Sequence, residues 1–235
     1  MRSVASDGYG ETGMKENTAR NKKFHKDTFD KTTEDRRQKV IEVAIEEFAS
    51  KGYSATSIND ISKKANISIG AMYSYFASKE DLFLSIVNSA DILMEKILKD
   101  ISDGSEDIFD CIEKMLKTSR KFALDYPQLN QIYLDITTQA LSHMSVRLSS
   151  ELERVTPKLL ANLIQQAKND GKITKNLDER VASYCIDNIF MMYQFSFSSD
   201  YYKERMKIFL GEDKLQAIDQ VEKNILGFIY SALGK

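Results

Sequence analysis

Apolar residues recur at helical spacing along most of this chain, and no stretch alternates apolar and polar residues as a half-buried strand does. One clear apolar face ends just before Gly52 and comprises Val40, Ile41, Ala44, Ile45 and Phe48. Only 10 of the 235 residues are Gly and 2 are Pro, which favours long helices over a sandwich or barrel of short strands. The pattern therefore predicts an all-α protein.

Residues 33–79 carry closely spaced signals for the beginnings and ends of helices. Ser57 lies three residues before Asp60, which is the spacing of a helix N-cap, and Ser68 and Ser78 precede two further helical segments. The break at residues 66–67 leaves a very short connection between the second and third helices. Three helices joined in this way predict a helix-turn-helix unit, whose third helix enters the major groove of DNA. A three-helix packing unit with no role on DNA is the alternative on spacing alone.

The rest of the chain divides into longer helical segments. We expect helices over about 78–101, 105–125, from Pro127 onward, 142–170 with a kink at Pro157, 178–199 and 213–233. Residues 1–32 show no apolar periodicity and are predicted to be a disordered basic arm. The expected organisation is this arm, a helix-turn-helix domain over 33–80 and a helical domain over 81–235.

Charge and composition narrow the range of functions. Residues 20–79 hold 12 basic and 8 acidic residues, although the whole chain has a net charge of −2, so the front of the chain could meet a polyanion. Ordinary surface variation explains the same imbalance equally well. Two Cys and two His residues exclude a disulfide framework and make a metal site improbable. No nucleophile and base are paired in sequence, so neither an enzyme nor a cofactor is expected. The lack of a long apolar run or a signal-like N-terminus predicts a cytoplasmic protein.

Residues 37–84 contain three characteristic segments: "FASKGYSATSI" at the end of the first helix, "ISKKANISIGAMYSYF" and "SKEDLF". In these segments the chain resembles the TetR family of bacterial transcriptional regulators. The resemblance implies that the helical region over 81–235 is a ligand-binding and dimerisation domain. It implies a cytoplasmic homodimer that binds a pseudo-palindromic operator as double-stranded DNA. It also implies a repressor that a small-molecule effector releases from the DNA, with no membrane partner.

The same resemblance assigns roles to residues of the helix-turn-helix unit. It implies that Ser57, Lys79, Tyr73 and Tyr75 contact phosphates, and that Ser68, Ile69, Gly70 and Ala71 lie closest to the base edges. Many relatives have Lys or Arg where this chain has Ile69, and Ile makes no bidentate contact to guanine. We therefore expect modest direct readout, with more weight on phosphate contacts and DNA shape.

The predicted arm could compensate for this weak readout. It carries five basic residues in a short stretch, Lys15, Arg20, Lys22, Lys23 and Lys26. A basic arm of this kind lies along the minor groove or the backbone in other DNA-binding proteins. A solvated tail without DNA contacts is an equally good interpretation.

The C-terminal part is rich in Met and aromatic residues, which adapt to irregular apolar ligands. Candidate pocket residues are Met115, Phe122, Tyr126, Tyr133, His143, Phe190, Tyr193 and Gln194. Few of these are charged, which favours a neutral or amphipathic effector. The resemblance also implies a dimer through 178–199 and 213–233, with a stripe formed by Ile186, Ile189, Tyr193, Ile218, Val221, Ile225 and Phe228. The alternative function keeps the same fold but acts through a protein partner bound by the C-terminal domain.

Overall fold

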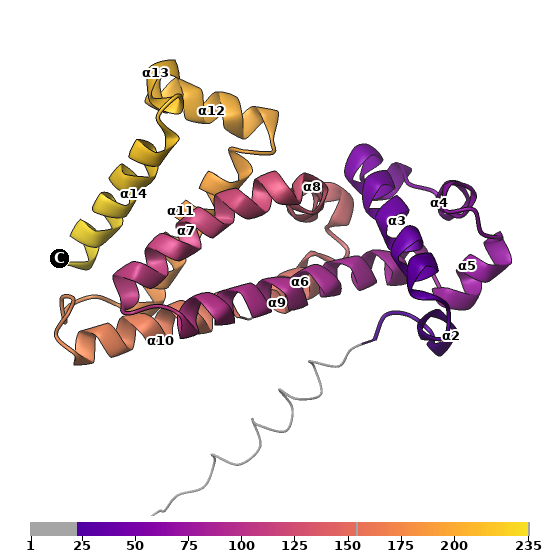
Figure 1. Ribbon diagram of the computed structural model, residues 1–235, viewed down its shortest axis with the longest axis horizontal. Helices are drawn as coiled ribbons and strands as arrows, with labels where there is room; N and C mark the ends of the chain where they lie inside the picture. The colour runs from indigo at the N-terminus through magenta and orange to yellow at the C-terminus, as the bar shows by residue number, and fades with distance from the viewer. Residues whose placement is uncertain (1–22, 154, 235) are drawn as a thin grey trace, which may run out of the picture.

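The computed structural model describes residues 23–153 and 155–234, and every regular element in these ranges is a helix (Figure 1). The all-α prediction is therefore confirmed. None of the described helices is long and apolar enough to cross a membrane. In chain order the elements are α2 (Asp27–Asp30), α3 (Glu34–Ala55), α4 (Ile58–Lys64), α5 (Ile69–Tyr75), α6 (Lys79–Asp103), α7 (Ile108–Asp125), α8 (Pro127–Ile136), the 3-10 helix η1 (Gln139–Leu141), α9 (Ser145–Leu152), α10 (Thr156–Asn169), α11 (Glu179–Phe195), α12 (Asp200–Leu210), α13 (Glu212–Leu215) and α14 (Ile218–Leu233).

The predicted cap residues begin the helices as expected. The Ser57, Ser68 and Ser78 hydroxyls accept hydrogen bonds from backbone amides in the first turns of α4, α5 and α6. Asp107 and Asp178 cap α7 and α11 with two amide hydrogen bonds each. These side chains satisfy amides that have no partner within their own helices.

The expected helix over 213–233 is divided into α13 and α14, and two further helical predictions were wrong in detail. The expected helix over 142–170 is divided into α9 and α10, and Pro157 stands in the first turn of α10 rather than at a kink. A proline suits this position because its missing N–H group would have no intrahelical partner there. The second error is α12, which was not predicted. This helix buries none of its residues, so its apolar positions form no stripe that marks a core-facing helix.

The arm predicted for residues 1–32 is also wrong in part, because residues 23–32 are folded. The short helix α2 lies against the helix-turn-helix unit, and Phe29 is buried between the rings of Tyr75 and Phe76. Residues 1–22 lie outside the described residues.

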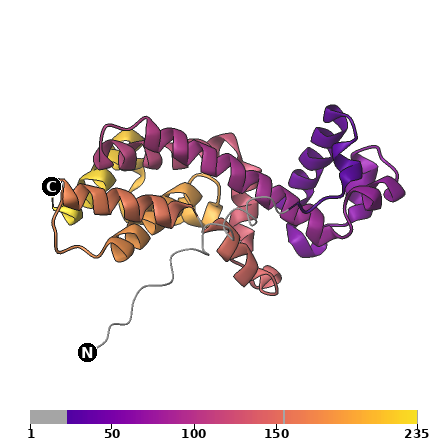
Figure 2. The same ribbon diagram turned by 90° about the horizontal axis from the view of Figure 1, so that it is seen from below.

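The small domain formed by α2–α5 lies at one end of an elongated helical body (Figure 1). Figure 2 shows α6 running from this domain along the body. One hydrophobic core joins α3, α4 and α5 to the first half of α6 and also includes Ile132 and Ile136 of α8 and Met144 and Leu148 near α9. A second core lies among the end of α6, α7, α10, α11 and α14. The predicted domain boundary at residue 80 is therefore not a break in the packing.

The stripe predicted for dimerisation divides between interior and surface. Ile186, Tyr193 and Val221 are buried within the single chain, so they are not available to a partner. Phe228 of α14 is 68% exposed, and Val181 and Tyr184 of α11 are also exposed. The helix faces that remain free differ from the ones deduced from the apolar spacing, because the spacing does not distinguish a core from an interface.

Candidate nucleic-acid interface and internal cavity

The connection between α4 and α5 is a tight turn. Ala65 ends α4, and Asn66 adopts a left-handed conformation with φ of 54°. Asn tolerates this region better than most residues other than Gly. The Ile67 amide then donates to the Ser62 carbonyl at 2.9 Å, and Ser68 begins α5. The turn holds the two helices in the angled arrangement of a helix-turn-helix motif.

One face of α5 is buried and the other is open to solvent. Met72 and Tyr75 pack into the core, whereas Ser68, Gly70 and Tyr73 are exposed and Ile69 is 39% exposed. Ala71 is half-buried at the edge of this face. The residues predicted to lie near base edges thus share the accessible side of the helix.

Gly70 is not required by packing inside the chain. A Cβ atom added to this glycine would meet no other atom within 4 Å. Gly70 therefore does not serve a close crossing of two helices. Because Gly70 has no side chain, another molecule can approach the backbone of α5 closely at this position.

Two residues predicted to contact phosphates have their side chains directed elsewhere. The Lys79 ammonium donates to the backbone carbonyls of Tyr53 (2.8 Å), Thr56 (3.0 Å) and Ser54 (3.3 Å), and lies 4.6 Å from the centre of the Tyr53 ring. It thereby joins the beginning of α6 to the end of α3. Tyr75 is only 6% exposed. By contrast Tyr73 is accessible and Ser57 is half-buried at the beginning of α4.

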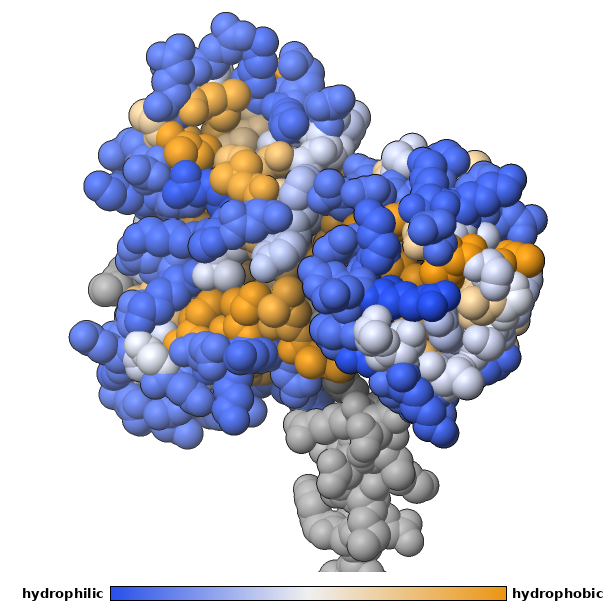
Figure 3. Space-filling view, turned by 45° about the vertical axis from the view of Figure 1, so that its right-hand side comes forward, coloured by the Kyte–Doolittle hydropathy of each residue, from blue (hydrophilic) through white to orange (hydrophobic). Residues whose placement is uncertain are grey.

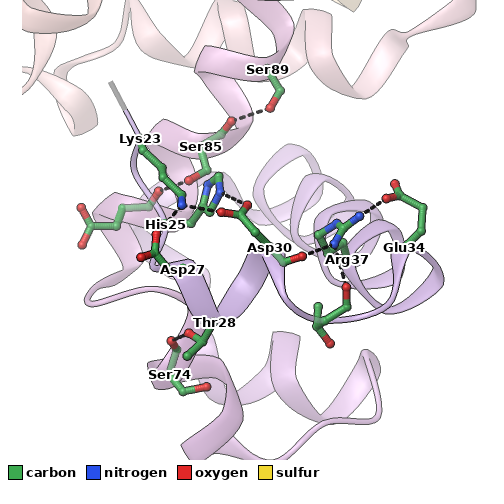
Figure 4. A network of polar contacts seen from close by, with 12 residues as sticks. Lys23, His25, Asp27, Thr28, Asp30, Glu34, Arg37, Ser74, Ser85 and Ser89 are labelled. Atoms are coloured by element: carbon green, nitrogen blue, oxygen red, sulfur yellow. Dashed lines mark hydrogen bonds and ion pairs between the residues drawn. The ribbon is translucent and has the colours of Figure 1, made fainter. Parts of the chain in front are cut away.

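Residues 23–30 form a strap across the C-terminal end of α5 (Figure 4). The Lys26 amide donates to the Tyr75 carbonyl at 2.8 Å, the Lys26 ammonium donates to the Tyr73 carbonyl at 2.8 Å, and the Thr28 hydroxyl donates to the Ser74 carbonyl. These are carbonyls that the last turn of a helix leaves without intrahelical partners. The strap therefore fixes the end of α5.

Two charges of the predicted arm are used inside this strap. Lys23 pairs with Asp27 and Asp30, and both hydrogen bonds raise the pKa of its ammonium. Lys26 binds α5 as described above. The other arm charges, Lys15, Arg20 and Lys22, lie outside the described residues.

The helical body contains a cavity of about 160 Å³ between α6, α7, α8 and α11. On the face shown in Figure 3, apolar residues gather on the body beside the helix-turn-helix domain, between hydrophilic bands. Most of the cavity wall is apolar. It is lined by Ile86, Val87, Ala90, Asp91, Met94, Leu98, Met115, Thr118, Ser119, Phe122, Leu129, Ile132, Tyr133, Ile136, Leu152, Glu153, Thr156, Asp187, Phe190, Met191 and Gln194.

Five of the eight predicted pocket residues belong to this wall, namely Met115, Phe122, Tyr133, Phe190 and Gln194. The other three do not. Tyr126 is exposed and packs its ring on Phe122 from outside the wall. His143 lies near the helix-turn-helix domain, with its ring 6.0 Å from that of Tyr53.

Tyr193, the third, belongs to a buried polar group instead. Its hydroxyl donates to the Glu222 carboxylate at 2.9 Å, and the same carboxylate binds the Arg120 guanidinium at 2.9 Å. Glu222 is only 2% exposed, so this pairing compensates a buried charge. The group joins α7, α11 and α14 and belongs to the packing of the body.

Three carboxylates in the cavity wall were missed from the sequence, Asp91, Glu153 and Asp187. A signal was present in α11, where Asp187 lies one turn before Phe190 and Met191 and shares their face. A charged residue inside an otherwise apolar face marks a polar position of a pocket. The structure thus corrects the expectation of a wall with few charges.

Burial and the nearby Glu153 charge raise the pKa of Asp187 to about 6. Burial is the larger of the two causes, because a carboxylate loses its hydration there. The Tyr133 hydroxyl donates to Glu153 at 3.1 Å, and burial raises the pKa of this tyrosine as well. In the part of the chain that the structure describes, no three His, Cys, Asp or Glu side chains are grouped to hold a metal ion.

The cavity and the helix-turn-helix domain share side chains. Ile132 and Ile136 of α8 line the cavity and also lie in the core of that domain, as do Ile86 and Val87 of α6. Helix α8 packs along α3. A second connection comes from α9, where Arg147 donates to Glu80 at the beginning of α6 at 3.1 Å. The cavity wall and the helix-turn-helix domain are therefore parts of one packed core.

The exposed face of α5, the tight turn before it and the helical body behind it define a helix-turn-helix DNA-binding regulator. The chain belongs to the TetR family: the profile of the bacterial regulatory proteins, tetR family, matches residues 40–86. The chain is 30% identical over 159 residues to a probable acrEF/envCD operon repressor of Escherichia coli K12, and the alignment covers 66% of this chain and 72% of that relative.

Solved structures show the same fold at low sequence identity. The fatty acid degradation regulator FadR from Bacillus halodurans is similar with a TM-score of 0.66 and 17% identity, covering 86% of this chain and 98% of that one. FadR from Bacillus subtilis, solved in complex with stearoyl-CoA, gives a TM-score of 0.61 and 18% identity, covering 83% and 97%. The relatives and neighbours of this chain are transcriptional regulators, and members of this family bind operator DNA and are typically dimers.

Proposed function

We propose that this chain is a repressor that binds a pseudo-palindromic operator as a homodimer and leaves it when a small molecule fills the cavity. The sharing of Ile132 and Ile136 between the cavity wall and the core of the DNA-binding domain carries this proposal. A ligand that displaces these side chains must also displace what packs against them. Packed cores have few alternative arrangements, so a small shift is passed on rather than absorbed.

The DNA contacts in this proposal come from the accessible side of the motif. Ser68, Ile69, Gly70 and Ala71 meet base edges from the beginning of α5, and Tyr73 and Ser57 bind phosphates. Lys79 and Tyr75 have structural roles instead, because their side chains are already engaged within the chain. Specificity then depends on apolar contacts, shape and deformability of the site more than on bidentate hydrogen bonds.

The dimer in this proposal uses the faces of α11 and α14 that the single chain leaves open. Val181 and Tyr184 on α11 and Phe228 on α14 are large apolar residues that are exposed on these helices. Burying such residues is favourable because apolar surface leaves water. A two-fold dimer places its two α5 helices on successive turns of the DNA, which requires a pseudo-palindrome.

The size of the cavity bears on how release would occur. A cavity of about 160 Å³ accepts a group about as large as benzene without rearrangement. The cavity is partly open to solvent, so only the part of a larger ligand that stays inside it pushes the wall outward, and α6 and α8 form much of that wall. The stearoyl-CoA bound by the Bacillus subtilis neighbour is a far larger molecule. An effector larger than the resting cavity would therefore favour a displaced arrangement of α6 and α8, and weaker DNA binding follows from that preference.

The test begins with selection of random duplex DNA on the purified protein, followed by anisotropy on the enriched sequence at several salt concentrations. We expect a pseudo-palindrome and a steep salt slope. Compounds are then screened for loss of anisotropy. If the selection enriches no sequence and the protein binds all duplexes weakly, the proposed function as a DNA-binding regulator is contradicted.

A pair of variants of α6 tests whether release operates through the cavity. Ala90→Leu fills space in the wall, whereas Ser89→Leu places the same side chain on the exposed face one residue away. We expect Ala90→Leu to lose the response to a releasing compound and Ser89→Leu to keep it. Equal responses of both variants would place the ligand elsewhere.

The alternative function, control by a protein partner, has one observation in its favour. Helix α12 buries none of its residues and exposes Ile208 and Phe209. An exposed apolar patch of this kind is typical of an interaction surface. The double variant Ile208→Glu, Phe209→Glu should keep the dimer mass and lose regulation in cells if a partner binds there. A monomeric double variant would instead place α12 in the dimer interface.

A further inference from the structure

The cavity is apolar in most of its wall, but carboxylates lie at several points around it. Asp91 comes from α6, Glu153 follows the end of α9, and Asp187 comes from α11. These elements are far apart in sequence, so the fold brings the acidic groups to one cavity. None of the described lining residues is Lys, Arg or His.

Asp187 has no complementary group in the described protein. No described residue donates a hydrogen bond to its carboxylate or forms an ion pair with it. The group that influences it most directly, Glu153, is itself acidic and receives a hydrogen bond from Tyr133 at 3.1 Å. A half-buried carboxylate of this kind is costly in an apolar surrounding, and a cation in the cavity would compensate it.

The remaining wall suits the rest of such a ligand. Phe122 and Phe190 offer aromatic rings, and Met115 and Met191 offer flexible, polarizable side chains. Aromatic faces attract organic cations, and methionine adapts to irregular apolar shapes. An anionic head group would face the same carboxylates and would find no basic partner among the described lining residues.

We propose that the cavity binds an organic cation, a tertiary or quaternary ammonium bearing an apolar group, with its charge between Asp187 and Glu153 and its apolar part among Phe122, Phe190 and the methionines. This inference names the ligand class for the proposed function and rests on that function for its regulatory meaning. It separates this chain from the stearoyl-CoA complex of the Bacillus subtilis neighbour, whose ligand carries negative charges.

The direct test compares three probes that differ in charge and little in shape. Phenyltrimethylammonium is the cation, tert-butylbenzene is its neutral isostere, and benzoate is an anion of similar size. Dissociation constants are measured by NMR titration of the full-length dimer without DNA, at fixed ionic strength. We expect the cation to bind and benzoate to bind at least tenfold more weakly. Tighter binding of benzoate than of the cation would overturn the proposal.

Variants then test whether the carboxylates cause the preference for a cationic ligand. The decisive quantity is the ratio of the dissociation constants of tert-butylbenzene and phenyltrimethylammonium, because hydrophobic contributions largely cancel in it. We expect this ratio to fall at least tenfold in the double variant Asp187→Asn, Glu153→Gln. The control Asp200→Asn removes a fully exposed charge on α12 and should leave the ratio unchanged. An unchanged ratio in the double variant would refute the assignment of these residues.

The experiment separates this inference from the proposed function. If the cation binds the cavity but never releases operator DNA, the ligand class stands and the regulatory proposal fails. If operator binding is confirmed and only neutral or anionic compounds release it, the regulatory proposal stands and the cation proposal fails. The comparison of the three probes on the unmodified protein needs no variant, so it remains decisive if the double variant does not fold.

Discussion

Replacing Asp187 with Asn should make the protein more stable at neutral pH, and the gain should disappear in acid. Asp187 is held in the apolar cavity wall with Glu153 nearby, and its pKa is raised from 3.8 to about 6. The proton is therefore bound more tightly in the folded protein than in the unfolded chain. The asparagine side chain has nearly the same shape and no charge.

The sign of the effect follows from proton linkage. Between pH 3.8 and about 6 the folded protein holds more protons at this site than the unfolded chain, so the free energy of unfolding falls as the pH rises through this window. Above about pH 6 the free energy of unfolding has fallen by the full amount that this group contributes. A shift of this size corresponds to about 3 kcal/mol at most, and the buried amide of the variant offsets part of the gain. We expect a net gain of roughly 1–2 kcal/mol above about pH 7 and none near pH 4.

The assay is urea unfolding of both proteins from about pH 4 to about pH 8, with the difference between them taken at each pH. Other groups titrate in this range, and the difference removes their common contribution. Among the described residues, the titratable groups in the wall around Asp187 are Glu153, Tyr133 and Asp91, and all three are retained in the variant. The exposed Asp200→Asn control should show no such pH dependence. A difference that does not change with pH, or a less stable variant at neutral pH, would refute the reasoning.

Three further predictions concern the DNA-binding motif and the body. Gly70→Ala should raise the melting temperature slightly, since a helical alanine is favoured by about 0.5–1 kcal/mol and finds open space, but it should weaken operator binding in anisotropy. Lys79→Met should lower the free energy of unfolding in urea by about 1–3 kcal/mol, because the carbonyls at the end of α3 lose their donor. The salt dependence of DNA binding should stay the same, and a salt slope smaller in magnitude by about 0.9 would show that Lys79 neutralises a phosphate. Glu222→Gln should lower the free energy of unfolding by about 2 kcal/mol, because Arg120 loses its buried, charged partner. Tyr193→Phe removes only one hydrogen bond and should lower it by less, and equal losses in unfolding experiments would contradict this ranking.

The sequence predicted the DNA-binding motif better than the body, for a physical reason. Ser57, Ser68 and Ser78 act on amides within three residues of themselves, so their roles are legible from local spacing. The role of Lys79 depends on three carbonyls more than 20 residues away, and nothing in its own neighbourhood indicates them. The strap from residue 23 was missed for the same reason, because its partners are the carbonyls at the end of α5.

The cavity shows a different limit of sequence analysis. Met115, Phe122 and Phe190 were predicted because large flexible or aromatic side chains are common in pockets, and the structure places them in the wall. Tyr193 has the same character but is not part of the wall, and its hydroxyl binds Glu222 instead. Composition identifies the kind of residue that lines a pocket, whereas the direction of each side chain depends on how the helices pack.

The arrangement of the two cores suggests how a ligand in this cavity would change DNA binding. The cavity lies where the two cores meet: Ile86 and Ile132 belong to the core of the DNA-binding domain, whereas Met115 and Phe190 belong to the core of the body. In the proposed mechanism, a ligand between them would change the distance between two packed units rather than the interior of one. Since each unit resists deformation, the displacement would take the form of a rotation of the DNA-binding domain, and in the proposed dimer two such rotations would change the spacing of the α5 helices. In the proposed mechanism the coupling would therefore follow from the position of the cavity, whereas the carboxylates would decide which molecules bind in it.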